Sequence, residues 1–100
     1  MIVINEKLLD EFRRKARCEF CGRKARGGLD AHHIYAKGMG GGSRLDIRRN
    51  LVGLCRECHT SHHAGNEPLR CDLMALVATR ENCLQDDIKE EVWRLRRTPK

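Results

Sequence analysis

Four of the six cysteines fall into two identical pairs, each with two residues between its members. The pairs are Cys18 with Cys21 and Cys55 with Cys58. This gap lets both sulfurs of a pair reach one ion, and two such pairs complete a tetrahedral thiolate site. Two disulfides or four buried thiols are the alternative. The doubled spacing predicts a structural Zn²⁺ that supplies much of the folding free energy.

The five histidines form a second group of candidate ligands, His32 with His33 and then His59, His62 and His63. Residues four apart share one face of a helix, so His59 and His63 can bind one ion, whereas neighbours on a strand point to opposite faces. One histidine of the adjacent pair can therefore bind the ion while the other remains free as a base. Imidazole has an ordinary pKa of about 6.5, which suits the deprotonation of water near neutral pH. A zinc-finger domain that is merely rich in histidine is the alternative.

The elements that must position these residues follow from apolar periodicity, capping residues and glycines. A helix is predicted over residues 6–17, because its apolar residues share one face behind the N-cap Asn5. Asn66 is expected to cap a later helix with Pro68 in its first turn. A last amphipathic helix is marked by Leu84, Ile88, Val92 and Leu95. The predicted bounds are 29–34 and 51–54 for two short strands, 35–49 for the loop between them, and about 56–64, 66–79 and 84–98 for three further helices.

Together the two groups carry a resemblance to a known family. The residues are His32-His33, Asn50-Leu51-Val52, Leu54-Cys55-Arg56-Glu57-Cys58-His59 and His63. In identity, order and spacing they resemble an HNH endonuclease of the variant in which two C-x-x-C pairs hold structural zinc. The resemblance implies a small α+β fold, a ββα-metal finger flanked here by an N-terminal helix and two C-terminal helices. Residues 1–100 are interpreted as a single HNH nuclease domain, with a motif core over about 17–65 and a helical extension over about 66–98.

The resemblance also implies a role for each matching residue. His33 matches the general base, and Asn50 matches the asparagine that fixes the loop and orients the base. Three histidines match the ligands of one catalytic ion: His32, His59 and His63. His63 is preferred over its neighbour His62 by spacing, and a carbonyl of the inter-strand loop is expected to hold the base in one tautomer. An all-histidine set favours Zn²⁺, Ni²⁺, Co²⁺ or Mn²⁺ over Mg²⁺.

The charge of the chain favours a polyanionic partner. Its formal net charge of +6 suits nucleic acid or an anionic membrane. No apolar run approaches the roughly 20 residues that span a bilayer, and residues 1–12 lack a secretory signal pattern. DNA, expected to be double-stranded, is therefore the predicted partner, in the cytoplasm of a bacterial or phage-infected cell. Basic residues beside the glycine-rich loop are expected to contact phosphate, with a plain solvated surface as the alternative: Lys37, Arg44, Arg48 and Arg49, joined by Arg23, Lys24 and Arg26.

These observations favour a metal-dependent DNA endonuclease, in which one divalent ion stabilises the leaving group and His33 acts as the base. A non-catalytic zinc-finger DNA-binding module and a zinc-knuckle protein-interaction adaptor are the alternatives. Small proteins of this kind resemble phage or prophage nucleases. Cys71 and Cys83 lie outside the paired pattern and are expected to pack as small apolar residues on helices.

Overall fold

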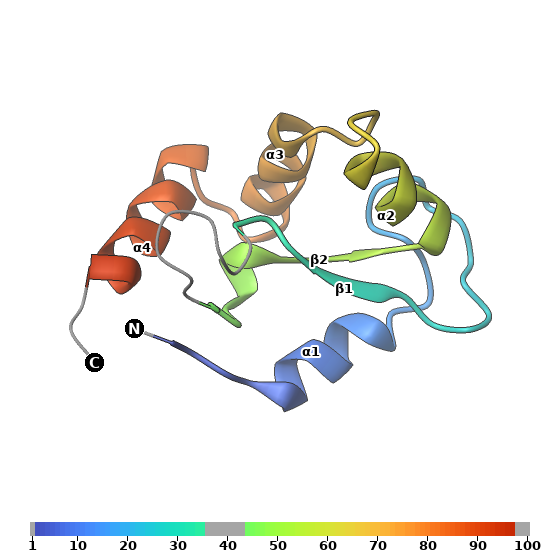
Figure 1. Cartoon of the computed structure of the whole chain (residues 1–100), viewed down its shortest axis with the longest axis horizontal. Coiled ribbons are helices and arrows are strands. Elements are labelled where there is room, and N and C mark those ends of the chain that lie inside the picture. The colour runs from blue at the N-terminus through green and yellow to red at the C-terminus, as the bar shows by residue number, and fades with distance from the viewer. Residues whose placement is uncertain (1, 36–43, 98–100) are drawn as a thin grey trace.

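The computed structural model describes residues 2–35 and 44–97, and its centre is a two-stranded antiparallel sheet (Figure 1). The strands β1 and β2 pair with Asp30 opposite Leu54 and His33 opposite Leu51. Helix α1 lies on one side of this sheet, α2 and α3 lie on the other, and α4 lies beside α3 (Figure 1). The bounds are Glu6–Arg13 for α1, Asp30–His33 for β1, Leu51–Leu54 for β2, Arg56–His63 for α2, Arg70–Arg80 for α3 and Gln85–Arg97 for α4. The succession β1, β2, α2 confirms the predicted ββα finger within a small α+β fold.

Helix α1 is shorter than predicted. Its start is as expected, because the Asn5 side chain accepts a hydrogen bond from the backbone N–H of Leu8 at 3.1 Å. Its end comes at Arg13 rather than at residue 17. The Arg13 carbonyl accepts a hydrogen bond from the backbone N–H of Leu29. In a continuing helix this carbonyl would instead accept from the N–H of residue 17. The chain after α1 is thereby tied to the segment that enters β1.

The start of α3 also differs from the prediction, because Asn66 does not cap it. The helix begins at Arg70, and the Asp72 carboxylate accepts from the backbone N–H of Leu69 at 2.8 Å. The residues before it are bonded to α2, where the Ser61 hydroxyl donates to the Glu67 carbonyl at 2.6 Å. This side-chain contact holds the segment between α2 and α3 out of the helix.

The core lies between the sheet and the two C-terminal helices. Its most buried members come from β2, α3, α4 and the segment before β2: Leu45, Val52, Leu54, Leu73, Val77, Ile88 and Val92. A smaller cluster under α1 contains Leu9, Phe12 and Leu51. Of the residues that marked the last helix, Ile88 and Val92 are buried on α4, whereas Leu84 precedes the helix and is 70% exposed. Among the described residues, no helix is long and apolar enough to cross a bilayer.

The connection between the strands is held at its far end by the N-terminal segment. The backbone N–H of Val3 donates to the Arg44 carbonyl and that of Asp46 donates to the Val3 carbonyl, both at 2.8 Å. A short 3₁₀ helix, Arg48–Asn50, follows where only loop was predicted. Lys37 and the glycines at 38 and 40–42 lie outside the described residues. The described end of the connection thus has a defined place beside the N-terminal segment.

Candidate active site and metal centres

The four paired cysteines come together as predicted. Their sulfur atoms all lie within 4.8 Å of one another, and the Sγ atoms of Cys21 and Cys55 are 3.8 Å apart. In both pairs the backbone N–H of the second cysteine points at the sulfur of the first, with N–S distances of 3.5 Å. None of the chain's six cysteines is in a disulfide. This cluster can hold a metal such as zinc, because four thiolates at such spacing are the usual donor set of a structural zinc site.

Glu19 brings the two pairs together across the fold. Its backbone N–H donates to the Gly53 carbonyl at 2.9 Å, and its carboxylate accepts from the Gly53 N–H at 2.6 Å. A Cβ atom at position 53 would lie 3.0 Å from the Leu29 side chain and 3.1 Å from the Phe12 carbonyl. A side chain at position 53 would therefore crowd Leu29 and the Phe12 backbone, so glycine lets α1 and the segment before β1 pack closely against β2.

The electrostatics of the cluster favour a bound cation. Burial raises the pKa of the Cys18 thiol, but hydrogen bonds from the backbone at Cys21, Cys55 and Phe20 outweigh it and lower the pKa to about 7. Burial and the neighbouring thiols raise the pKa of Cys58 well above its ordinary value. Without a bound cation, the raised pKa values of Cys55 and Cys58 oppose deprotonation of these two thiols beside the first pair. A divalent metal compensates that charge, which couples metal binding to folding.

The two remaining cysteines differ from the expectation. Cys71 is exposed on α3 rather than packed, and Cys83 lies in the turn before α4, half-buried against the core. Neither belongs to a group of metal-binding side chains in the described part of the chain.

Three histidines form the second cluster. The ligand nitrogens of His32, His59 and His63 lie within 4.8 Å of one another, and the Nε2 atoms of His59 and His63 are 3.0 Å apart. His32 comes from β1, and the other two lie one turn apart on α2. Burial, followed by the nearby imidazoles, lowers the pKa of His32 to about 3, so its ring is neutral near pH 7.

One buried atom shows that this cluster fits a cation. The Nε2 atom of His32 is buried and has no hydrogen-bond partner among the described residues. A buried polar atom without a partner costs roughly 1–3 kcal/mol, and a metal at the lone pair would satisfy it. The neutral ring and the converging nitrogens together make a donor set suited to a divalent ion.

Asp30 supports this cluster, although no motif in the sequence singles it out. Its carboxylate lies 2.9 Å from Nδ1 of His59, which leaves Nε2 of that ring facing His63. A carboxylate behind a metal-binding imidazole orients the ring and sets its tautomer. Its position in the sequence could have identified Asp30, because it precedes His32 by two residues on the strand and therefore shares its face. His62 instead bonds through Nδ1 to the Pro68 carbonyl at 2.7 Å.

His33 bonds to a buried carboxylate. Its Nε2 atom lies 2.7 Å from Oδ1 of Asp46, whose side chain is fully buried. Burial raises the pKa of Asp46, but hydrogen bonds from Arg44, the Asn5 backbone and His33 together hold that pKa below its ordinary value. The ionised carboxylate accepts the Nε2 proton, so Nδ1 is the nitrogen able to accept another. Among the described residues the partner of this ring is a carboxylate, which the pairing of residues 3 and 45 brings close to β1, whereas residues 36–43 of the loop expected to supply a carbonyl lie outside the described residues.

Asn50 joins the two ends of the connection between the strands. Its side-chain amide donates to the carbonyls of Leu45 at 2.9 Å and Tyr35 at 3.2 Å, and its oxygen accepts from the Tyr35 N–H at 2.8 Å. Asn50 is fully buried. These bonds hold the segment that carries Asp46 against the end of β1.

Replacing Asn50 by alanine is expected to lower the free energy of unfolding by about 3 kcal/mol, because each buried group left without a partner costs roughly 1–3 kcal/mol. Urea unfolding followed by circular dichroism measures the loss. Asn66→Ala, at an exposed position, is the matched control. Equal stability of the two variants would contradict this account of Asn50.

Four of the arginines predicted to contact phosphate form ion pairs within the protein. Lys37, which was also predicted to contact phosphate, lies outside the described residues. The phosphate role of the arginines stays a prediction, since each guanidinium already has a carboxylate partner. The pairs are Arg23 with Glu57, Arg44 with Glu6 and Asp46, Arg48 with Glu11 and Glu81, and Arg49 with Glu91.

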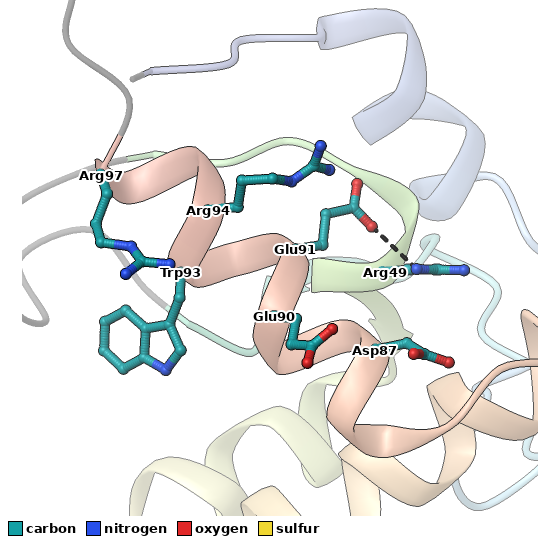
Figure 2. Close-up of a pocket in the computed structure, with 7 residues that line it drawn as sticks. All are labelled: Arg49, Asp87, Glu90, Glu91, Trp93, Arg94 and Arg97. Carbon is teal, nitrogen blue, oxygen red and sulfur yellow. Dashed lines mark hydrogen bonds and ion pairs between the residues drawn. The ribbon is translucent and has the colours of Figure 1, made fainter.

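Figure 2 shows the last of these pairs, between Arg49 and Glu91, at a cavity of about 480 Å³ on α4. Asp87 and Glu90 bring its carboxylates to three, beside three arginines and Trp93. No histidine or cysteine lines it. The cavity is therefore separate from both candidate metal centres.

Comparison with known proteins identifies the family of this segment. The family model for HNH endonuclease matches residues 18–65, which contain the four paired cysteines, the five histidines and Asn50. No curated protein and no solved structure gives a significant match. Residues 18–65 therefore match the HNH endonuclease family, and their clustered cysteines are consistent with its zinc-knuckle variant.

Proposed function

We propose that this protein is a metal-dependent endonuclease that hydrolyses phosphodiester bonds in double-stranded DNA. The observation that carries the proposal is the different surroundings of two neighbouring residues of β1. His32 contributes a buried, unpartnered nitrogen to the histidine cluster, while His33 is held by an ionised carboxylate. The family match supports a nucleic acid as the substrate.

The proposed reaction is hydrolysis of the phosphodiester with His33 as the general base. His33 accepts a proton from water at Nδ1, the water oxygen forms a bond to phosphorus, and the bond from phosphorus to the 3′ oxygen breaks. Asp46 keeps Nε2 protonated and stabilises the imidazolium that forms. The leaving oxygen takes a proton from solvent. Asn50 keeps Asp46 in place by closing the connection on which it lies.

The histidine cluster would hold the catalytic ion. His32, His59 and His63 would hold one divalent cation, which would supply Lewis-acid stabilisation of the negative charge that develops in the reaction. Three imidazoles favour Zn²⁺, Ni²⁺, Co²⁺ or Mn²⁺ over Mg²⁺. The carboxylate of Asp30 fixes the ring of His59 in the orientation this requires.

Relaxation of supercoiled plasmid tests the proposal. The zinc-loaded protein is expected to convert plasmid to open or linear forms when each divalent ion is added in turn. Asp30→Asn should need about 10–100-fold more metal for half-maximal rate, the usual cost of losing a carboxylate behind a ligand, and His59→Ala more again. Metal titration is preferable to a chelator, which would also remove metal from the cysteine cluster. If wild-type protein binds DNA but cuts none with any ion, it is a zinc-finger binding module instead.

A further inference from the structure

A basic cleft lies beside the histidine cluster, between the turn after the first cysteine pair and the first turn of α2. Its volume is about 340 Å³, and its charged lining residues are Arg23, Lys24, Arg26, Asp30, Arg56 and Glu57. We propose that this cleft binds a backbone phosphate of the DNA next to the phosphate that is cut. The inference rests on the proposed nuclease function and adds a substrate-binding subsite to it.

The position of the cleft follows from the geometry of α2. Arg56, His59 and His63 are three and four residues apart, so they lie along one face of the helix. At a rise of about 1.5 Å per residue, Arg56 lies about 4.5 Å along the helix axis from His59. Asp30 touches both, with 3.3 Å between its Oδ1 and the Arg56 guanidinium and 2.9 Å between its Oδ2 and Nδ1 of His59. The Asp30 carboxylate therefore both lines the cleft and contacts the histidine cluster.

The charge of the cleft suits an anion. Four cationic side chains and two carboxylates line it. The ion pairs of Arg23 with Glu57, at 3.7 Å, and of Arg56 with Asp30, at 3.3 Å, involve arginines that are 62% and 78% exposed. Exposed pairs of this kind contribute little free energy and are easily exchanged for a phosphate.

Lys24 and Arg26 are the cations most available to a ligand. Both are exposed, and in the part of the chain that the structure describes no carboxylate lies within ion-pairing distance of either. Arg49 differs, because its guanidinium forms an ion pair with Glu91 at the α4 cavity (Figure 2). Gly27 also lines the cleft, and a Cβ added there would meet nothing within 4 Å. The cleft therefore offers two available cations and open backbone, which a phosphodiester can approach closely.

The salt dependence of DNA binding tests the proposal. The double variant Lys24→Ala with Arg26→Ala is compared with a control that removes the same charge, Lys7→Ala with Lys89→Ala. Both control positions are exposed, on α1 across the sheet from α2 and on α4. Fluorescence anisotropy of a labelled DNA duplex is recorded over a series of salt concentrations, with zinc-loaded protein and no second ion. The slope of log K against log salt should fall by about 0.9, the contribution of the one phosphate that the protein no longer neutralises.

Two readouts distinguish this proposal from the proposed nuclease function. If the cleft variant keeps the slope and affinity of the control, or if wild-type protein does not bind the duplex, the cleft proposal is overturned. If its slope falls while wild-type protein fails to cut plasmid, the cleft proposal stands and the nuclease proposal fails. Zinc content and thermal unfolding should match wild type in both double variants, since all four side chains are exposed. The milder pair Lys24→Gln with Arg26→Gln gives the same comparison should alanine disturb the turn.

Discussion

Replacing His33 by alanine is expected to lower the single-turnover rate of DNA cleavage about 10²–10⁴-fold, the usual contribution of a general base. The histidine cluster keeps all of its nitrogens in this variant, so the affinity for the second metal ion should be unchanged. Rapid-quench cleavage and isothermal titration with Ni²⁺ or Co²⁺ measure the two quantities separately.

His32→Ala provides the opposite control, because it removes a ligand and keeps the base. It should lose affinity for the ion and recover part of its cleavage rate when metal is raised. If His33→Ala loses the ion and His32→Ala keeps it, the two roles are assigned the wrong way round. If His33→Ala cuts as fast as wild type, His33 is not the base.

Asp46 can be separated from a merely structural role in the same assay. Asp46→Asn retains the shape but removes the charge, and its amide can donate to Nε2 and so favour the wrong tautomer of His33. We expect a loss of rate of about 10–100-fold with unchanged metal affinity. Combined with His33→Ala, the Asp46→Asn substitution should cost little further rate, because both act on the same proton.

Replacing Cys55 by serine is expected to unfold the protein or to lower its melting temperature by tens of degrees. Structural zinc in small domains contributes about 10–16 kcal/mol of apparent binding free energy, whereas a domain of this size is stable by about 5–15 kcal/mol. The Cys55 side chain also caps α2 by accepting from the Cys58 N–H. Serine is a good N-cap, so the substitution removes the metal ligand and keeps the cap.

Cys71→Ser is the matched control, because Cys71 is exposed and lies outside the cluster. It should bind one structural zinc and melt like the wild type. Elemental analysis of purified protein and thermal unfolding by circular dichroism give both values. If zinc-free wild-type protein remains folded, or if the Cys55→Ser variant melts like the wild type, zinc is not required to stabilise this fold.

The sequence by itself determined the parts of the site that depend on short-range spacing. The two-residue gaps place both sulfurs of each cysteine pair together, and four residues of helix bring His59 and His63 to one face. The alternation of a strand sends His32 to α2 and His33 to Asp46, on opposite faces of β1. The ββα order was likewise predicted, because periodicity and glycines mark its elements within a few residues.

The tertiary structure decided every feature whose partner lies far along the chain. Asp46 reaches His33 only because the N-terminal segment pairs beside residue 45, and Asp30 reaches His59 across 29 residues of sequence. The same holds for the basic residues, since sequence spacing does not show which arginine meets a carboxylate. Arg48 is engaged by two carboxylates, whereas Lys24 and Arg26 remain exposed in a cleft beside the histidines. Charge type is written in the sequence, but the availability of that charge depends on neighbours that only folding supplies.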